Sequence, residues 1–389
     1  MATVIRVRAS TLALKFEAAP GLDAFGGGVP NALTDFIKAD IDIAYNQTQV
    51  TNTELTYALE MAAPIPGGTK VTVTVTCMAK GSGTPGVAPQ WGRLMELCGM
   101  QKVVTAAAIA AQAATGGTTS SATLGAGYAA TAGLYQGMPA LLSGNPAVPL
   151  QTLIAQYTGT KVATFGHTLP AALDNTTMVS IPANVLYRPI TDPALIQSAT
   201  LNIYTDGLLW KVTGCAANWM LDAPAGGAGT LKFTLTGQYN PPVAAVAPPG
   251  LAFDAVTPPV YRGGISRLNG NLVRVSKISF DGGVKLYEPE NPEAGEGFDP
   301  SIITSRDPKG NFDPLMSVSD TIARMAAFKA GTPQVAAVGI GSVPGNMVGV
   351  LAPYAQYTGM TPTKRNDLFA ENIPFSCPGP NSSIFVAVS

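Results

Sequence analysis

Apolar and polar residues alternate strictly over residues 70–77. Valines occupy one set of positions and threonines the other: Val71, Val73 and Val75 against Thr72, Thr74 and Thr76. A period of two is that of a β-strand, in which successive side chains point to opposite faces. The pattern therefore predicts a strand with one buried face and one polar face.

A short amphipathic helix is predicted next, after a Gly/Pro-rich loop at residues 81–89. Trp91, Leu94, Met95 and Cys98 recur at spacings of three and four, which places them on one helical face, and Gly99 is a typical helix terminator.

Alternation typical of further strands occurs at residues 9–17 and 37–45. Four more strands are predicted at residues 199–204, 208–212, 218–221 and 230–237. In the last of these, Leu231, Phe233 and Leu235 oppose Lys232, Thr234 and Thr236. This strand repeats the polar face of residues 70–77.

The second half of the chain repeats the order of elements in the first half. Residues 273–289 correspond to the strand at 37–45, residues 302–313 to the strand at 70–77, and residues 320–330 to the helix. We therefore predict an internal duplication: a first domain at 1–245, a Pro-rich linker at 246–260, and a second domain at 261–389.

One segment has no counterpart in the second half. Residues 105–184 are rich in Ala, Gly, Thr and Ser, and they contain no charged residue before Lys161. Scattered leucines and tyrosines provide apolar side chains that can be buried in a core, so an ordered, loop-rich surface insertion is favoured over disorder.

The composition indicates an assembling protein. Charged residues make up 12% of the chain, the formal net charge is −1, and Gly and Pro contribute 42 and 32 residues. Nucleic-acid binders need clustered Lys and Arg, so a protein that grips nucleic acid is disfavoured. No signal peptide and no membrane-length apolar run is visible, which predicts a protein made in a cytoplasm. Four widely spaced cysteines predict reduced, mostly buried thiols.

No catalytic, cofactor or metal site is predicted, and we do not expect an enzyme. The single histidine, His167, has no partner at a recognisable spacing, and GSGTPG at residues 81–86 lacks the Lys-Ser/Thr of a phosphate loop. An acidic cluster, Glu288, Glu290, Glu293, Glu296 and Asp299, does not have calcium-loop spacing. An exposed interaction arm is the favoured interpretation of that cluster.

Several ordered motifs resemble one family. They are AKGSGTPGVAPQWGRLMELCGM at residues 79–100, LNIYTDGLLWKVTGCAANW at 201–219, LKFTLTGQYNPP at 231–242 and DTIARMAAFKAGT at 320–332. Together they resemble the tail tube, or major tail, proteins of long-tailed bacteriophages. The resemblance implies a mainly β fold of tandem β-sandwich or barrel domains, each with a short flanking helix. One sheet of each domain would join a continuous inner β-barrel when rings assemble.

The resemblance also implies a function. The chain would be a virion tail subunit, assembled in the host cytoplasm, whose stacked homo-oligomeric rings conduct viral DNA without binding it specifically. Tape measure, tail terminator and distal tail proteins would be its other partners, with no membrane involved. Three chains per ring, with pseudo-sixfold shape, are favoured over six, and the insertion would lie outside.

Residue roles follow from the same resemblance. The lumen-facing candidates are Thr72, Thr74, Thr76, Lys232, Thr234 and Thr236. Two long connections, at residues 46–68 and 288–299, would reach the adjacent ring, with candidates Gln49, Asn52, Glu54, Glu288, Glu290, Glu293 and Glu296. A capsid or decoration protein is the main alternative; an outer-membrane porin and a tail-borne enzyme or adhesin are less favoured.

Overall fold

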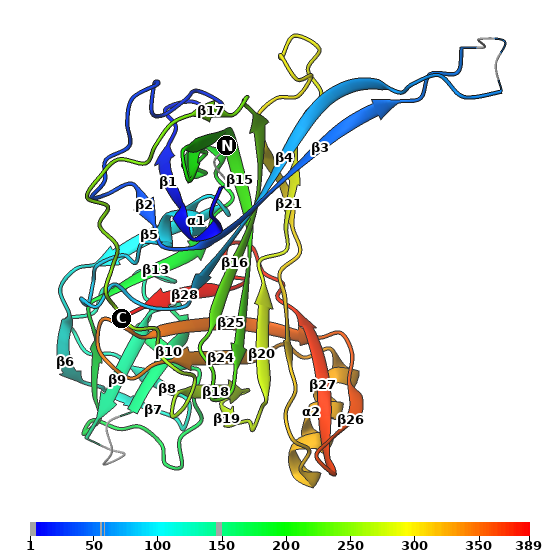
Figure 1. The fold of residues 1–389 in the computed structure, drawn as a ribbon. Helices are drawn as coiled ribbons and strands as arrows, with labels where there is room; N and C mark the ends of the chain where they lie inside the picture. The colour runs from blue at the N-terminus through cyan, green and yellow to red at the C-terminus, as the bar shows by residue number, and fades with distance from the viewer. Residues whose placement is uncertain (1–4, 55–56, 58, 145–149) are drawn as a thin grey trace.

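A computed structural model describes residues 5–54, 57, 59–144 and 150–389 of the 389-residue chain. The fold is mainly β (Figure 1). Leu55, Thr56 and Ala58 of the first predicted arm, and residues 145–149 of the predicted insertion, lie outside the described residues.

One sheet runs through both halves of the chain. From the first half it takes β3 (Asp40–Val50), β4 (Ile65–Met78), β16 (Thr230–Tyr239) and β15 (Leu208–Pro224). From the second half it takes β20 (Lys277–Asp281), β23 (Lys309–Phe312), β27 (Leu368–Ser376) and β26 (Thr361–Arg365). Each strand is antiparallel to the next, in the order β3-β4-β16-β15-β20-β23-β27-β26, and we call this sheet the wall sheet.

Other strands of the two halves form the layer behind the wall sheet. In the first half they are β1 (Ser10–Phe16), β2 (Phe36–Ile37) and β14 (Ala199–Thr205). In the second half they are β18 (Ile265–Leu268), β19 (Asn271–Leu272), β24 (Gln334–Ile340) and β25 (Val348–Tyr357). β28 (Phe385–Val388), β13 (Asn184–Pro189) and β5 (Met100–Thr105) extend the layer beyond β25.

Strand pairing has the same order in both halves. The first half pairs as β2-β1-β14-β15-β16-β4-β3. The second half pairs as β19-β18-β24-β25-β27-β23-β20, again antiparallel throughout. A helix occupies the same place in each half: α1 (Gly92–Glu96) follows β4, and α2 (Val318–Ala330) follows β23. The two halves are therefore alike in topology.

One predicted break does not exist. Residues 208–212 and 218–221 belong to a single 17-residue strand, β15, so the prediction of two strands is wrong. Gly214, with φ of 62°, lies where the register of β15 against β16 shifts between Thr213 and Ala216. A bulge bends the strand without ending it, so β15 pairs with β14 at one end and with β20 at the other.

The predicted loop-rich insertion contains a sheet of its own. Its strands are β6 (Ile109–Ala113), β7 (Gly116–Gly117), β8 (Ser121–Thr123), β9 (Pro139–Ser143), β10 (Leu150–Tyr157), β11 (Val162–Phe165) and β12 (Met178–Ile181). They form a seven-stranded sheet in the order β6-β12-β9-β10-β11-β8-β7. Thr105 and Asn184 are direct partners across β5 and β13, so the chain leaves and returns to the layer at one point.

β24, β25 and β28 lie between two of the hydrophobic cores. In β24, Ala336 and Val338 pack in the core beneath the wall sheet, whereas Ala337 between them packs in the core of the insertion. Leu351 and Phe385 also face the insertion. The molecule therefore has three layers, in which the wall sheet and the insertion lie on opposite sides of β24, β25 and β28.

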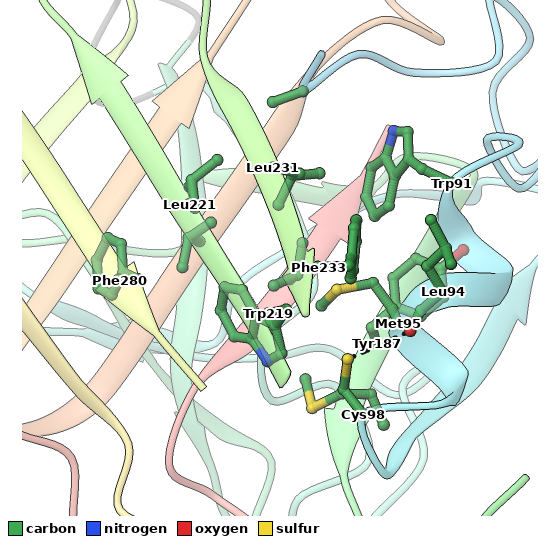
Figure 2. Packing of buried hydrophobic residues seen from close by; sticks show 14 of the residues in the cluster. Trp91, Leu94, Met95, Cys98, Tyr187, Trp219, Leu221, Leu231, Phe233 and Phe280 are labelled. Atoms are coloured by element: carbon green, nitrogen blue, oxygen red, sulfur yellow. Dashed lines mark hydrogen bonds between the residues drawn. The ribbon is translucent and has the colours of Figure 1, made fainter. Parts of the chain in front are cut away.

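The core beneath the wall sheet contains the predicted apolar positions. Val71, Val73 and Val75 are at most 1% exposed, and the four predicted helix-face residues, Trp91, Leu94, Met95 and Cys98, are also buried. Figure 2 shows Trp219 and Phe233, from neighbouring strands, turned toward the side chains of the α1 segment. All four cysteines are free and buried, and burial raises the pKa of Cys77 to about 12. The prediction of reduced, buried thiols is confirmed.

Smaller elements complete the chain. These are β17 (Val243–Ala244), β21 (Val284–Tyr287), β22 (Ile302–Arg306) and the 3₁₀ turns Val7–Ala9 and Pro193–Leu195. The Pro-rich segment 246–260 is tied to both halves, because Lys80 pairs with Asp254 and the Asn346 amide donates to the Thr257 carbonyl at 2.9 Å.

Two phenylalanines on β27 provide a matched test of this core. Phe375 is 1% exposed and packs edge-on against Phe280 at 5.9 Å between ring centroids, whereas Phe369 is 60% exposed. Phe375→Ala should lower the free energy of unfolding by about 3–5 kcal/mol, because it leaves a cavity. Phe369→Ala should change it by less than about 0.5 kcal/mol. Denaturant unfolding of both variants measures the difference, and equal losses would contradict the placement of Phe375 in the core.

Candidate functional site

The exposed face of the wall sheet is a polar surface to which both halves contribute. One row of directly paired residues crosses seven strands: Asp40, Thr76, Lys232, Met220, Asp281, Lys309 and Ser376. Because alternate residues of each strand point into the core, these side chains lie on the opposite face. We call this surface the polar face.

The six predicted lumen residues meet on this face. Thr76 is the cross-strand partner of Lys232, Thr74 of Thr234, and Thr72 of Thr236. Lys232 is exposed and the five threonines are partly exposed. The pairing brings together residues separated by about 160 positions in the sequence, as expected for two alternating strands in antiparallel register.

Charges on the polar face are of both signs and nearly balanced: the row that crosses seven strands contains two Asp and two Lys. Asp222 pairs with Lys277 at 3.0 Å, and the Asn218 amide donates to the Asp281 carboxylate at 3.0 Å. Lys232 has no ion-pair partner among the described residues. Hydroxyl and amide groups hold water, whereas isolated charges give a polyanion little to bind. The chemistry of this face suits contact with solvent.

The part of the polar face that the second half of the chain contributes was not predicted from the sequence. Ser279 and Asp281 of β20 and Asn311 of β23 continue it beyond β15. Ile278 and Phe280 alternate with these polar residues and are buried, so the same two-residue period was present in residues 277–281. The short length of the strand hid the signal.

The acidic segment 288–299 covers one end of the polar face. The Gln238 amide donates to the Phe298 carbonyl at 3.1 Å, and Thr236 lies 2.6 Å from the hydroxyl of Ser301, just beyond the segment. Gly68 allows this close approach, since a Cβ there would lie 1.9 Å from the Glu296 carbonyl oxygen. Thr236 is thus partly covered by this part of the chain.

The prediction of an exposed acidic arm is wrong for Glu288. Its side chain is buried beside Lys70, with 3.5 Å between Nζ and Oε2, and burial raises the pKa of its carboxyl. Glu296 is partly buried and accepts a hydrogen bond from the Thr69 amide at 2.9 Å. Glu290 and Glu293 are exposed. The segment therefore folds back on its own chain through contacts that the spacing of acidic residues does not reveal.

The other predicted arm does project from the molecule. β3 and β4 extend beyond the wall sheet as a two-stranded hairpin, as Figure 1 shows. Gln49 and Glu54 are exposed, and Asn52, which is partly exposed, accepts a hydrogen bond from the Glu54 amide at 3.0 Å.

His167 is a packing residue. It is 4% exposed, and its Nδ1 lies 2.9 Å from the Thr152 hydroxyl. In the loop at residues 81–86, the Gly81 amide donates to the Asn346 side chain and the Gly83 amide to the Gly345 carbonyl, so the loop is a structural contact between the halves.

Nothing in the described part of the chain forms a metal-ligand group of three or more His, Cys, Asp or Glu side chains. No helix in that part has the length and apolar character to cross a membrane. The chain matches no protein-family model and no curated protein.

The pH dependence of stability tests the buried histidine. Burial and the nearby Arg267 charge lower the pKa of His167 to about 4. The unfolded chain takes up this proton near pH 6.5 and the folded chain only near pH 4, so acidification across this window destabilises the fold. His167→Gln should abolish about 2–3 kcal/mol of this loss.

The measurement is urea unfolding of both proteins at pH 7 and pH 4.5. Because the chain has a single histidine, the difference between wild type and variant isolates this group from the carboxylates. An identical pH dependence in the two proteins would show that the pKa of His167 is the same in the folded and the unfolded chain.

Proposed function

We propose that the chain is a structural subunit of a phage tail tube, whose stacked rings form the conduit for viral DNA. The observation that carries the proposal is the wall sheet, which runs across both halves with one buried and one polar face. A tube wall needs such a sheet, because one side must hold the subunit together while the other faces a water-filled channel.

The free edges of the wall sheet support ring closure. Inside the chain, residues 220–224 of β15 pair with β20. In the second half, β26 corresponds to residues 220–224 of β15. β26 pairs with the wall strand β27, just as that end of β15 pairs with the wall strand β16. β3 corresponds to β20. We therefore propose that β26 of one chain pairs with β3 of the next, which removes both open edges.

The strand count gives the size of the ring. Eight wall strands per chain and three chains give 24 strands. At about 4.8 Å per strand, the backbone circle is about 37 Å across before strand tilt widens it. Such a channel admits a B-form duplex. Three chains with two tandem tube-type domains each, at 1–245 and 261–389, would give the ring a pseudo-sixfold shape.

The polar face would line this channel. Thr74, Thr76 and Thr234 present hydroxyls, and the formal net charge of the chain is −1. DNA would pass without specific binding, because no dense array of cations faces it. Conduction is therefore passive, and the proposal includes neither a cofactor nor catalysis.

The three-layer arrangement favours an outer position for the insertion. Its sheet packs on β24, β25 and β28, on the side away from the polar face. Each ring of three chains would carry three outer protrusions. The tape measure, tail terminator and distal tail proteins are the proposed further partners, in a virion tail assembled in the host cytoplasm.

Electron microscopy of the purified protein tests this proposal. We expect rings or tubes whose mass per ring equals three chains and whose rotational average is threefold. Six chains per ring would refute the placement of both halves in the wall. Closed shells, or the absence of any ring at all, would favour a capsid or decoration protein.

A further inference from the structure

An apolar groove remains open on the second half of the chain. It has a volume of about 670 Å³ and lies between the first turns of α2 and the start of β27. Val318 and Ile322 of α2 are 82% and 65% exposed, and Leu368 and Phe369 of β27 are similarly exposed. Contiguous patches of exposed apolar side chains mark interaction surfaces.

The fold uses only one end of the apolar side of α2: Ala327 and Phe328 are partly buried against the core beneath the wall sheet, whereas Val318 and Ile322 are exposed. Arg324 is the one buried residue of the helix, and it pairs with the buried Glu371 at 2.7 Å. Ser317 caps the start of the helix and Gly331 its end, so both ends of α2 are satisfied without a contact to Val318 or Ile322. By contrast, the segment around α1 buries Trp91 and Leu94. The exposed side of α2 therefore lacks the cover that α1 has.

A second exposed apolar group lies at the tip of the arm. Tyr57 and Leu59 are fully exposed and Met61 is 77% exposed. Large apolar side chains gain stability when another surface covers them. In Figure 1 the arm points away from one end of the molecule, whereas α2 and the β26–β27 hairpin lie at the other end.

The charges of the two surfaces are complementary. Residues 51–64 of the arm contain Glu54 and Glu60 and no Lys or Arg. Among the residues that line the groove, Arg274 alone is charged; it is exposed and forms no ion pair within the described part of the chain. An acidic, apolar tip thus fits a groove with one free cation.

We propose that the α2 groove receives the arm tip of a second copy of this chain in the adjacent ring. The proposal rests on the proposed function, because it names the contact through which rings stack. A tip at one end and a groove at the other form a head-to-tail contact, which does not close on itself and therefore builds an open stack.

Cross-linking between two cysteine variants tests the contact directly. Met61→Cys and Ile322→Cys would be made separately, mixed during assembly, and treated with a short thiol cross-linker. The four native cysteines are buried, so they should not compete. A cross-linked dimer of the two variants is expected in tubes. Val29→Cys, at a residue 76% exposed on another loop, replaces Met61→Cys as the control and should give none.

A charge swap provides the second test. Arg274→Glu should lower the yield of long tubes at least tenfold while leaving rings intact, because two acidic surfaces then face each other. Glu60→Arg in the same chain should restore much of the yield, and Glu60→Arg alone should not. Circular dichroism checks that each variant is folded.

The outcomes separate the two proposals. If wild-type protein forms no rings or tubes, the tail tube function itself fails. If wild-type tubes form but Met61→Cys never cross-links to Ile322→Cys, or if Arg274→Glu stacks as well as wild type, the groove is not the receptor of the arm and the tail tube function still stands.

Discussion

The architecture depends on the main-chain pairing of β15 with β20. Five consecutive residue pairs, from Met220–Asp281 to Pro224–Lys277, join the two halves edge to edge. Without this contact the polar face would end at β15, and each half would present an open edge of the kind that causes strands to mispair. The bulge at Gly214 makes the contact possible, because it lets one strand belong to the layer at one end and to the wall at the other.

The alternation of apolar and polar residues along each strand gives the joined sheet one buried face and one polar face. Phe233 and Leu235 fill the core while Lys232 and Thr234 point the other way, so stability and surface chemistry are encoded by neighbouring residues of one strand. Behind the core, alternation in β24 lets a single strand contact both the wall core and the insertion. Changes in the insertion can therefore leave the polar face unaltered.

The spacing of apolar residues in the sequence predicted individual strands, one helix face and part of the polar face. The Val/Thr strand, the face of α1 and the six polar-face residues follow from spacing, and they lie as the alternation requires. Contacts between distant segments could not be predicted in this way. The burial of Glu288 against Lys70 depends on a chain reversal, and the insertion sheet depends on pairings among residues rich in Ala and Gly, which carry little periodic signal. The sequence pattern predicts two strands in place of β15, because a glycine bulge resembles a turn in sequence.

A reconstruction of the assembled protein by cryo-electron microscopy, at a resolution that separates strands, tests the central claim most directly. The account predicts one continuous barrel in which β26 of each chain is hydrogen-bonded to β3 of the next, with Thr74 and Thr234 on the channel wall. Density showing β20, β23 and β27 outside the barrel, or the polar face turned away from the channel, would contradict it.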